Sequence, residues 1–363
     1  MSSDELAGRK PGTDAAVRAR TIIRSALEGC GYTVTEQKTS GPGINLIAVQ
    51  RDVPHRPRRV LVSAHYDHLG VIDGKVMNGA DDNAAAVGSV VELACRISKI
   101  ETSAAAPTAP EITTRQASLV VAFWDTEEPP FFMTPDMGSA WFVANPTLPL
   151  ESIDVSIVLD LVGHELWPGF PSHVVLGAET SSAIESAVTA TPSPPGLDIV
   201  QASLHLVEAI VSMGATGHRQ SWSDYHAFRE SRVPVLFLSN GQGHHYHRPT
   251  DDFDTLDLTK LGLQTDWLVA LVDRLLTSST RPRFEDRDER PEIDAAAARH
   301  LVQGALTHIG SNGPGTEHFD RAPLAADLGR LRTDISTLSL RRAVQRVQCY
   351  ASATYPKAVC AQL

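Results

Sequence analysis

The sequence has no long apolar stretch and no excess of positive charge. Its 363 residues contain no run of about 18 or more apolar residues, and the N-terminal segment lacks the apolar core of a signal peptide. The net charge is −11, whereas nucleic acids and anionic membrane surfaces select basic patches. These absences predict a cytoplasmic protein that binds neither nucleic acid nor a membrane.

Cysteine is scarce and is not arranged in a motif. The four cysteines are scattered and show no C-x-x-C spacing: Cys30, Cys95, Cys349 and Cys360. This pattern predicts reduced structural thiols. A Cys349–Cys360 pair stays open as an alternative if the compartment is oxidising.

Hydrophobic and charged residues are present in the proportions of a packed globular protein, 42% and 21%. Strand-like apolar runs alternate with helical patterns up to about residue 277, which predicts a three-layer α/β/α domain with a mixed β-sheet over residues 1–280. Two early strands, 32–37 and 44–50, flank the turn at 40–43, so they predict an antiparallel edge. Helical patterns at 295–309 and 324–351 predict a helical C-terminal extension, 281–363, that packs on this domain rather than forming a lid or dimer contact.

Several buried strands end in residues that bind metals. The apolar run 60–64 leads into His65 and Asp67, and the run 119–124 leads into Glu127 and Glu128. Since ligands collect beyond the carboxyl ends of strands in open α/β sheets, we expect these side chains to meet in one crevice.

Two further features require a countercharge. Asp160 interrupts the apolar run 155–162, and a lone carboxylate costs several kcal/mol to bury there. Asp81 and Asp82 are adjacent, and their mutual repulsion raises one pKa unless a cation lies between them. A divalent metal is the simplest cation, although a solvated Asp-Asp-Asn helix cap is the alternative for these two residues.

Taken together, these histidines and carboxylates match a site for two metals. One bridging carboxylate, with one histidine and one carboxylate for each metal, uses five residues of this set once His247, after the strand 233–239, is included. Glu127 is then a free carboxylate beside the ligand Glu128. A general base for amide hydrolysis requires such a group next to metal-activated water.

These residues resemble the zinc aminopeptidase family of the clan MH peptidases, which includes bacterial leucyl aminopeptidases and relatives of glutamate carboxypeptidase II. The matching segments follow the family's order over residues 60–257. They are His65-Tyr66-Asp67, Gly79-Ala80-Asp81-Asp82-Asn83-Ala84, Glu127-Glu128 with Gly138-Ser139, Leu159-Asp160, Ser223-Asp224 with Phe228, and Tyr246-His247-Arg248-Pro249-Thr250-Asp251.

The resemblance implies a role for each residue of the set. Asp81 would bridge two Zn²⁺ ions per chain, with His65 and Asp160 completing one site and Glu128 and His247 the other. It also implies a general base, Glu127, a residue that orients the His65 ring, Asp67, and a cis peptide between Asp81 and Asp82.

The sequence departs from the family in two places. Residues 129–137 intervene between Glu128 and Gly138, and we expect this loop to line the mouth of the site through Phe131 and Phe132. Tyr225 stands where the family often has histidine, so the role of that histidine is not transferred. Tyr225 and Tyr246 are further candidates for the substrate pocket. With five ligands assigned, three nearby histidines are expected to be structural or at the rim: His68, His244 and His245.

The resulting hypothesis is a metal-dependent exopeptidase, an aminopeptidase that hydrolyses N-terminal peptide bonds with a water bridging two zinc ions and a glutamate base. Its substrate would be a peptide or aminoacyl amide, and no oligomeric state is assigned. The alternatives are a mono-zinc acyltransferase of the glutaminyl cyclase type, a carboxypeptidase or amide hydrolase on the same fold, and an inactive binding protein that would lack a ligand or the base.

Overall fold

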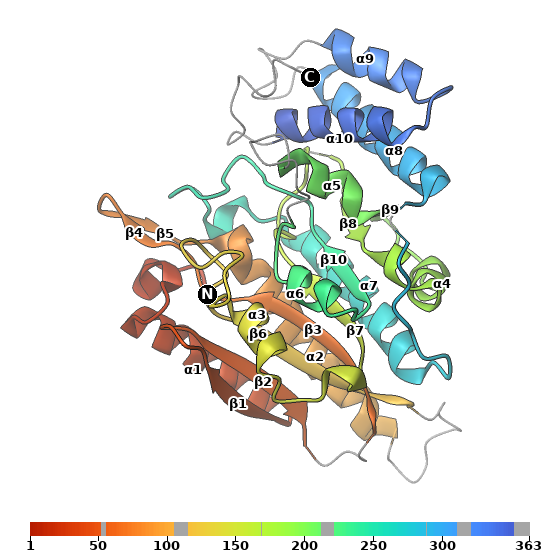
Figure 1. Ribbon diagram of the computed structural model, residues 1–363. Helices are drawn as coiled ribbons and strands as arrows, with labels where there is room; N and C mark the ends of the chain where they lie inside the picture. The colour runs from red at the N-terminus through yellow and green to blue at the C-terminus, as the bar shows by residue number, and fades with distance from the viewer. Residues whose placement is uncertain are drawn as a thin grey trace.

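The strands form a mixed sheet. The structure is a computed structural model that describes residues 1–51, 56–104, 115–167, 169–211, 221–287, 289–310 and 321–351. Within these residues one eight-stranded sheet has the order β1-β2-β6-β3-β7-β10-β8-β9, and β4 and β5 form a separate hairpin (Figure 1). The strands are β1 (Tyr32–Lys38), β2 (Ile44–Gln50), β3 (Arg58–His65), β4 (Gly70–Ile72), β5 (Lys75–Met77), β6 (Ala117–Trp124), β7 (Ile153–Leu159), β8 (Ser172–Leu176), β9 (Asp198–Ala202) and β10 (Val235–Leu238).

The strand directions agree with the predicted sheet. The central strands β6, β3, β7 and β10 run parallel, whereas β1 pairs antiparallel with β2 at one edge. Antiparallel pairing also joins β2 to β6 and β10 to β8. The mixed α/β sheet and its antiparallel edge are therefore confirmed.

Helices cover both faces of the sheet, as the three-layer prediction requires. They are α1 (Asp14–Gly29), α2 (Ala85–Ala104), α3 (Gly138–Ala144), α4 (Ser182–Ala190), α5 (Leu204–Val211), α6 (Tyr225–Glu230), α7 (Leu258–Thr277), α8 (Pro291–Gly310), α9 (Arg321–Arg330) and α10 (Thr337–Ala351). Short helical turns are η1 (Asp4–Arg9), η2 (Ala80–Ala84), η3 (Leu150–Ser152), η4 (Ala178–Thr180) and η5 (Phe253–Thr255). No helix within the described ranges is long and apolar enough to cross a membrane.

The hydrophobic core consists of two clusters, one on each face of the sheet. Val62 and Val121 pack with α1, α2, α4 and α7 on one face, while Leu61 and Val120 pack with α3, α5, α6, α8 and α10 on the other. Successive side chains of a strand point to opposite faces, so the continuous apolar runs of β3 and β6 are explained by helices on both sides.

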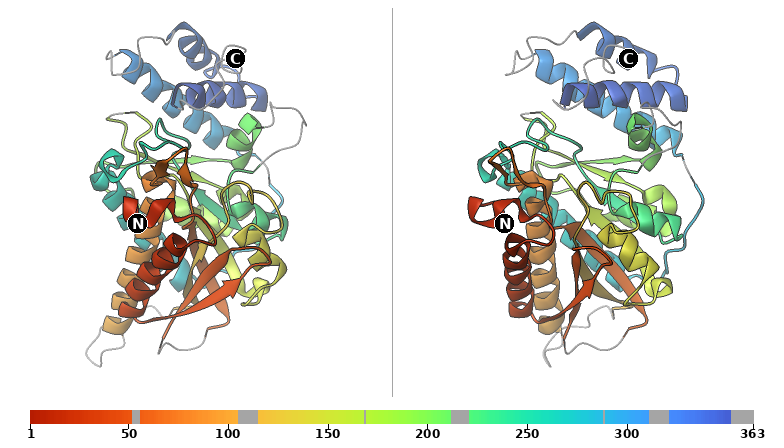
Figure 2. Two further views of the ribbon diagram at one scale, coloured as in Figure 1. Left: turned by 90° about the vertical axis from the view of Figure 1, so that its left-hand side faces the viewer. Right: turned by 60° about the vertical axis from the view of Figure 1, so that its left-hand side comes forward.

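The C-terminal helices share the second core with the sheet. Val302 and Val344 are buried in the same cluster as Phe237 of β10. Buried polar contacts add to this packing, because Asp294 of α8 lies 3.0 Å from His205 Nε2 and accepts the backbone N–H of Ser203 at 2.7 Å. In every view α8, α9 and α10 lie together at one end of the molecule (Figure 2). The helical extension is confirmed, and the boundary at residue 280 stays a prediction.

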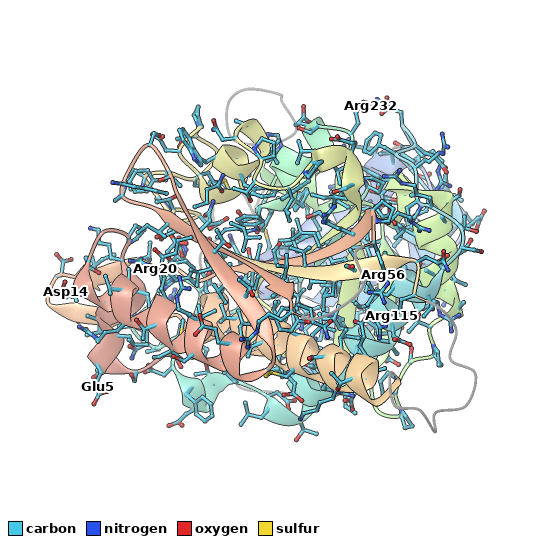
Figure 3. The ribbon with its side chains drawn as sticks, turned by 90° about the horizontal axis from the view of Figure 1, so that it is seen from below. Glu5, Asp14, Arg20, Arg56, Arg115 and Arg232 are labelled. Carbon is cyan, nitrogen blue, oxygen red and sulfur yellow. A yellow bond between two sulfur atoms is a disulfide. The ribbon has the colours of Figure 1, made fainter. Side chains whose placement is uncertain are left out.

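Ion pairs occupy the opposite end of the sheet, before β3 and β6 begin. Arg56 lies 2.7 Å from Glu101, and Arg115 lies 2.8 Å from Asp273. Seen from below, Arg56 and Arg115 are close neighbours (Figure 3). The candidate metal ligands lie instead at the carboxyl ends of the strands.

A disulfide joins the first two long helices. Cys30, which caps the C-terminus of α1, is bonded to Cys95 of α2 across a sequence separation of 65. The prediction of reduced thiols is wrong for this pair, because the approach of two helices far apart in sequence cannot be deduced from cysteine spacing. Cys349 is also disulfide-bonded. Its suggested partner, Cys360, lies outside the described residues. The predicted cytoplasmic location stays a prediction.

Removing this bridge is expected to destabilise the protein. Cys95→Ala should lower the free energy of unfolding by about 2–4 kcal/mol, because the bridge restricts a long loop in the unfolded chain. The measurement is urea unfolding of the oxidised protein, and Cys30→Ala should give the same loss. A reducing agent should lower the midpoint of the parent chain more than that of either variant. Equal midpoints for parent and variants would contradict the prediction.

Candidate metal centre

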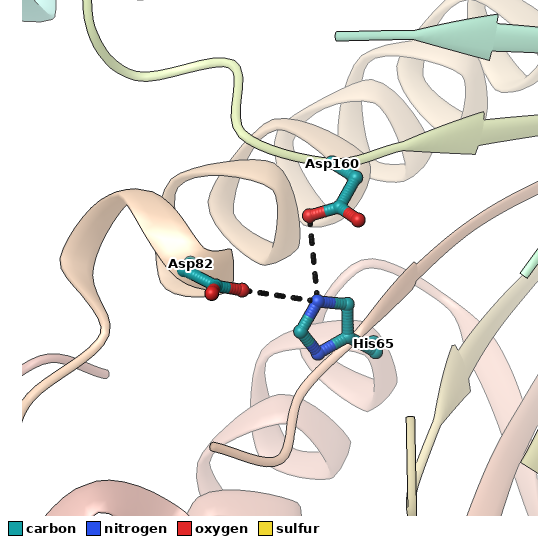
Figure 4. Close-up of side chains that lie close together, drawn as sticks. All are labelled: His65, Asp82 and Asp160. Atoms are coloured by element: carbon teal, nitrogen blue, oxygen red, sulfur yellow. Dashed lines mark ion pairs between the residues drawn. The ribbon is translucent and has the colours of Figure 1, made fainter. Parts of the chain in front are cut away.

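Parallel strands deliver the first group of ligands. β3 ends at His65, and Asp160 directly follows its parallel neighbour β7. His65 Nε2 lies 3.3 Å from Asp82 Oδ1 and 3.4 Å from Asp160 Oδ1 (Figure 4). One nitrogen and two carboxylates therefore face a common point at the end of the sheet.

A second group shares Asp82 with the first. His247 Nε2 lies 3.2 Å from Asp82 Oδ2 and 3.1 Å from Glu128 Oε2. The two oxygens of Asp82 are thus directed to different histidines. Asp82 occupies the position between the two groups that a bridging carboxylate requires.

This arrangement corrects the assignment of Asp81 as the bridge. The Asp81 carboxylate accepts the backbone N–H of Gly163 at 2.6 Å and lies 2.6 Å from His164 Nδ1. It is directed away from His65 and His247. The cis peptide correspondingly follows Asp82, between Asp82 and Asn83, and not Asp81. Adjacent residues of an irregular turn can point in different directions, so sequence order alone does not distinguish them.

The donor set fits zinc. Among the described residues, two atoms of the first group are buried without a hydrogen-bond partner: His65 Nε2 and Asp160 Oδ1. Buried polar atoms normally have partners, and imidazole nitrogens and carboxylate oxygens are the ligands that Zn²⁺ accepts. His65, Asp82 and Asp160 would hold one ion, and Asp82, Glu128 and His247 would hold another.

The electrostatics of the site also favour the binding of a cation. Burial raises the pKa of Glu127 well above its ordinary value, against the opposing charge of His65. Burial by itself lowers the pKa of His247, but hydrogen bonds to Asp82 and Glu128 raise it to about 10. So many buried carboxylates are stable together only with cations among them.

Asp67 and Asp251 accept hydrogen bonds from the backbone of the residues around the site. The oxygens of Asp67 accept the N–H groups of Glu127 at 3.1 Å and Glu128 at 3.2 Å, and Oδ1 lies 3.5 Å from His65 Nδ1. Asp251 accepts the N–H groups of Asp81 and Asp82 at 2.8 and 3.0 Å. Asp67 therefore contacts His65, as predicted, and in addition positions the Glu127-Glu128 pair.

A buried arginine near the N-terminus supports the same loop. Arg9 is 1% exposed and donates to the carbonyls of Tyr66 at 2.8 Å and Gly79 at 2.9 Å. It also donates to the carbonyls of Asn78 and Asp82, at 2.5 and 3.4 Å. The sequence contained no signal for this role, because an arginine before the first predicted helix is indistinguishable from an exposed one.

Replacing Arg9 is expected to weaken zinc binding. Arg9→Met removes donors from four carbonyls that shape the loop bearing Asp82, and the loss of such outer contacts typically costs 10–100-fold in metal affinity. We expect a loss of about this size in competition with a chelator of known affinity. Arg18→Met, on the exposed side of α1, is the control and should bind zinc as the parent does. Reduced stability with unchanged zinc affinity would contradict the prediction.

The structure changes the interpretation of His68. This side chain is buried, and its Nδ1 lies 2.7 Å from Glu128 Oε1. It is not at the rim, and with Asp82 and Glu128 it makes a group able to hold a metal. Its position three residues after His65 was the available signal. His244 and His245 are exposed, in agreement with a position at the rim.

The four candidates for the substrate pocket lie in different environments. Phe131 and Phe132 are half-buried in the loop after Glu128, and their role stays a prediction. Tyr246 is half-buried and stacks on His247, with ring centres 3.8 Å apart. Tyr225 is 0% exposed and its ring packs on Phe237, so the prediction that it contacts substrate directly is wrong. A tyrosine after a polar motif does not reveal that a helix buries it.

Comparisons with known proteins match most of the chain. The family model "Peptidase family M28" matches residues 45–272. The uncharacterised protein YfbL of Escherichia coli is 24% identical over 274 residues, covering 70% of this chain and 79% of YfbL.

Solved structures with the same fold have different reported activities. The LapA aminopeptidase of Legionella pneumophila has a TM-score of 0.56 and 17% identity, covering 75% of this chain and 68% of LapA. The glutaminyl cyclase of Porphyromonas gingivalis also has a TM-score of 0.56, with 19% identity and coverage of 75% and 94%. A leucine aminopeptidase precursor from Bacteroides thetaiotaomicron has a TM-score of 0.54 and 18% identity, with coverage of 76% and 93%.

The matched region contains every residue of the two groups, from His65 to His247, and accounts for more than half of the chain. The resemblance read from the sequence is thereby confirmed at the level of the family. The chain belongs to peptidase family M28 and is a zinc metallopeptidase.

Proposed function

We propose that the chain is an aminopeptidase that uses two zinc ions and Glu127 as general base. The observation that carries this proposal is Asp82, whose two oxygens face separate histidines at 3.3 and 3.2 Å. A shared carboxylate between two groups of ligands is what a pair of ions requires. A single ion would leave one group of buried carboxylates without a countercharge.

Zinc held by these residues would lower the pKa of water and polarise the scissile carbonyl. Glu127 is 6% exposed, and its Oε2 lies 3.9 Å from His65 Nε2, so it stands beside the first group without belonging to it. In the proposed reaction Glu127 takes a proton from the attacking water and delivers it to the leaving amine as the amide C–N bond breaks. Asp67 holds the backbone of Glu127 in place for both transfers.

The competing activities differ in the substrate group that they need. An aminopeptidase needs a free amine next to the scissile bond, a carboxypeptidase needs a free carboxylate, and a glutaminyl cyclase forms a ring from an N-terminal glutamine without adding water. The glutaminyl cyclase fold supports keeping the last activity as an alternative. The complete set of ligands and base argues against an inactive binding protein.

The test combines metal content with substrate panels. Protein purified without chelator should contain two zinc ions per chain and hydrolyse aminoacyl p-nitroanilides, with activity lost on chelation and restored by zinc. N-acetylated versions of the same substrates are the matched control and should not react. One ion with cyclisation of glutaminyl peptides would favour the cyclase activity. Hydrolysis of N-acylated dipeptides alone would favour a carboxypeptidase.

A further inference from the structure

His68 lies beside the second group of ligands, which consists of Asp82, Glu128 and His247. Its side chain is buried, and its ring lies at 67° to the ring of His247 with centres 5.8 Å apart. Its Nδ1 lies 2.7 Å from Glu128 Oε1 and 3.9 Å from Asp82 Oδ2. His68 is therefore next to every member of the second group, although the predicted set of ligands did not include it.

The hydrogen bond to Glu128 defines what His68 can do. An ionised carboxylate only accepts hydrogen bonds, so Nδ1 of His68 donates and has no lone pair left for a metal. Glu128 Oε1 is engaged by this bond, whereas Glu128 Oε2 lies 3.1 Å from His247 Nε2. One oxygen of Glu128 is thus held by His68, and the other is directed to the second group.

The packing around His68 fixes this hydrogen bond. Gly79, in the loop that carries Asp82, has φ +58°, and a Cβ at this position would lie only 2.6 Å from the His68 ring. On the other side, the backbone N–H of Glu128 donates to Asp67 Oδ2 at 3.2 Å. The ring and the main chain of Glu128 are both held in place, so the Glu128 side chain has little freedom to turn its second oxygen toward an ion.

We infer that His68 sets the metal preference of the second group, because it restricts Glu128 to a single ligand oxygen and thereby favours Zn²⁺ over Mn²⁺. The inference rests on the proposed function, in which the second group holds one of two ions. Zn²⁺ is stable with about four ligands, whereas Mn²⁺ favours about six, mostly oxygens. A Glu128 released from His68 could offer both oxygens, which suits the larger coordination number. His68 is a positioning residue and not a ligand.

Removing the donor tests the inference. His68→Leu should lower the affinity of the second group for Zn²⁺ at least about tenfold, as is usual when a partner of a ligating carboxylate is lost. Its affinity for Mn²⁺ should stay the same or rise, so the ratio of the two affinities falls at least about tenfold. The measurement is chelator competition on the full-length, metal-free protein with each metal alone. The step that His247→Ala abolishes identifies the second group.

Three further variants separate positioning from other roles. The amide of His68→Asn can donate from the place of Nδ1 and should keep the ratio of the parent chain. The amide of His68→Gln falls nearer the place of Nε2, so this variant should repeat the loss and serves if His68→Leu does not fold. His244→Leu changes an exposed histidine and should leave the ratio unchanged. A melting curve of each metal-free variant shows that it is folded.

Two results would overturn the inference. Equal losses of Zn²⁺ and Mn²⁺ affinity in His68→Leu and His68→Gln would mean that His68 only supports the structure. A loss of Zn²⁺ affinity in His68→Asn as large as in His68→Leu would mean that His68 binds the ion itself.

Metal binding is measured without turnover, so it separates this inference from the proposed reaction. If aminoacyl p-nitroanilides do not react but the ratio falls in His68→Leu, the proposed reaction fails and the role of His68 stands. Two ions and aminopeptidase activity with an unchanged ratio in His68→Leu would overturn the role of His68 alone. If the parent binds a single ion, the proposed pair of ions fails, and the role of His68 stands only if the ratio for that ion falls in His68→Leu.

Discussion

Glu127→Gln should lower kcat for aminoacyl p-nitroanilides by about 10²–10⁴-fold, the usual contribution of a general base. The amide keeps the shape of the side chain but cannot accept the proton of the attacking water. Zinc content should stay at the value of the parent chain, because Glu127 stands beside the ligands and the substitution removes none of them. The measurement is kcat together with metal analysis of the same preparation.

A control variant and two contrary results test this prediction. Glu92→Gln, on the exposed side of α2, should leave kcat unchanged. Retained activity in Glu127→Gln would require another base. A simultaneous loss of zinc would mean that Glu127 is a ligand, and the assignment of Glu128 as the ligand of the pair would have to be reconsidered.

The second large effect is expected at Asp82. Asp82→Asn should weaken zinc binding by more than about 100-fold, beyond the usual cost of losing an outer contact, because the carboxylate faces both histidine groups. The measurement is zinc affinity by chelator competition and the number of ions retained per chain. Both ions should be affected, since Asp82 belongs to both groups.

Asp81→Asn is the control supplied by the chain itself. Asp81 is adjacent in sequence and also buried, but its carboxylate contacts Gly163 and His164. Asparagine keeps an oxygen for the Gly163 N–H, so zinc binding should fall by less than about 100-fold. A larger loss in Asp81→Asn than in Asp82→Asn would restore Asp81 as the bridging residue.

The strands and the place of the site were predictable from local pattern. Apolar runs such as 60–64 and 119–124 are buried on both faces, and each ends in residues that an apolar strand does not require, His65 or Glu127-Glu128. The physical reason is that hydrophobic periodicity reflects burial directly, and parallel strands bring their carboxyl ends to one edge. The strands β8 and β9, the last two in the order of the sheet, were not predicted, because their short runs carry no comparable pattern.

Contacts between residues far apart in the chain could not be predicted from the sequence. Arg9 supports the loop of Asp82 across more than 70 positions, and Cys30 meets Cys95 through the packing of two helices. His68 was set aside because five ligands already completed the predicted set. Each case depends on which surfaces of distant elements meet, and spacing along the chain contains no measure of that.

The sequence by itself determined the class of chemistry: carboxylates and histidines at strand ends predict a metal, and their order identified the family. Tertiary structure decided which carboxylate of Asp81-Asp82 faces both His65 and His247. It also decided which residues support the loop that carries Asp82. It placed α8 and α10 over an apolar cavity against β8 and β10. The type of a residue sets how it can react, and the hydrophobic periodicity around it indicates whether it is buried. Its direction and its distant neighbours are set only when the helices and the sheet pack together.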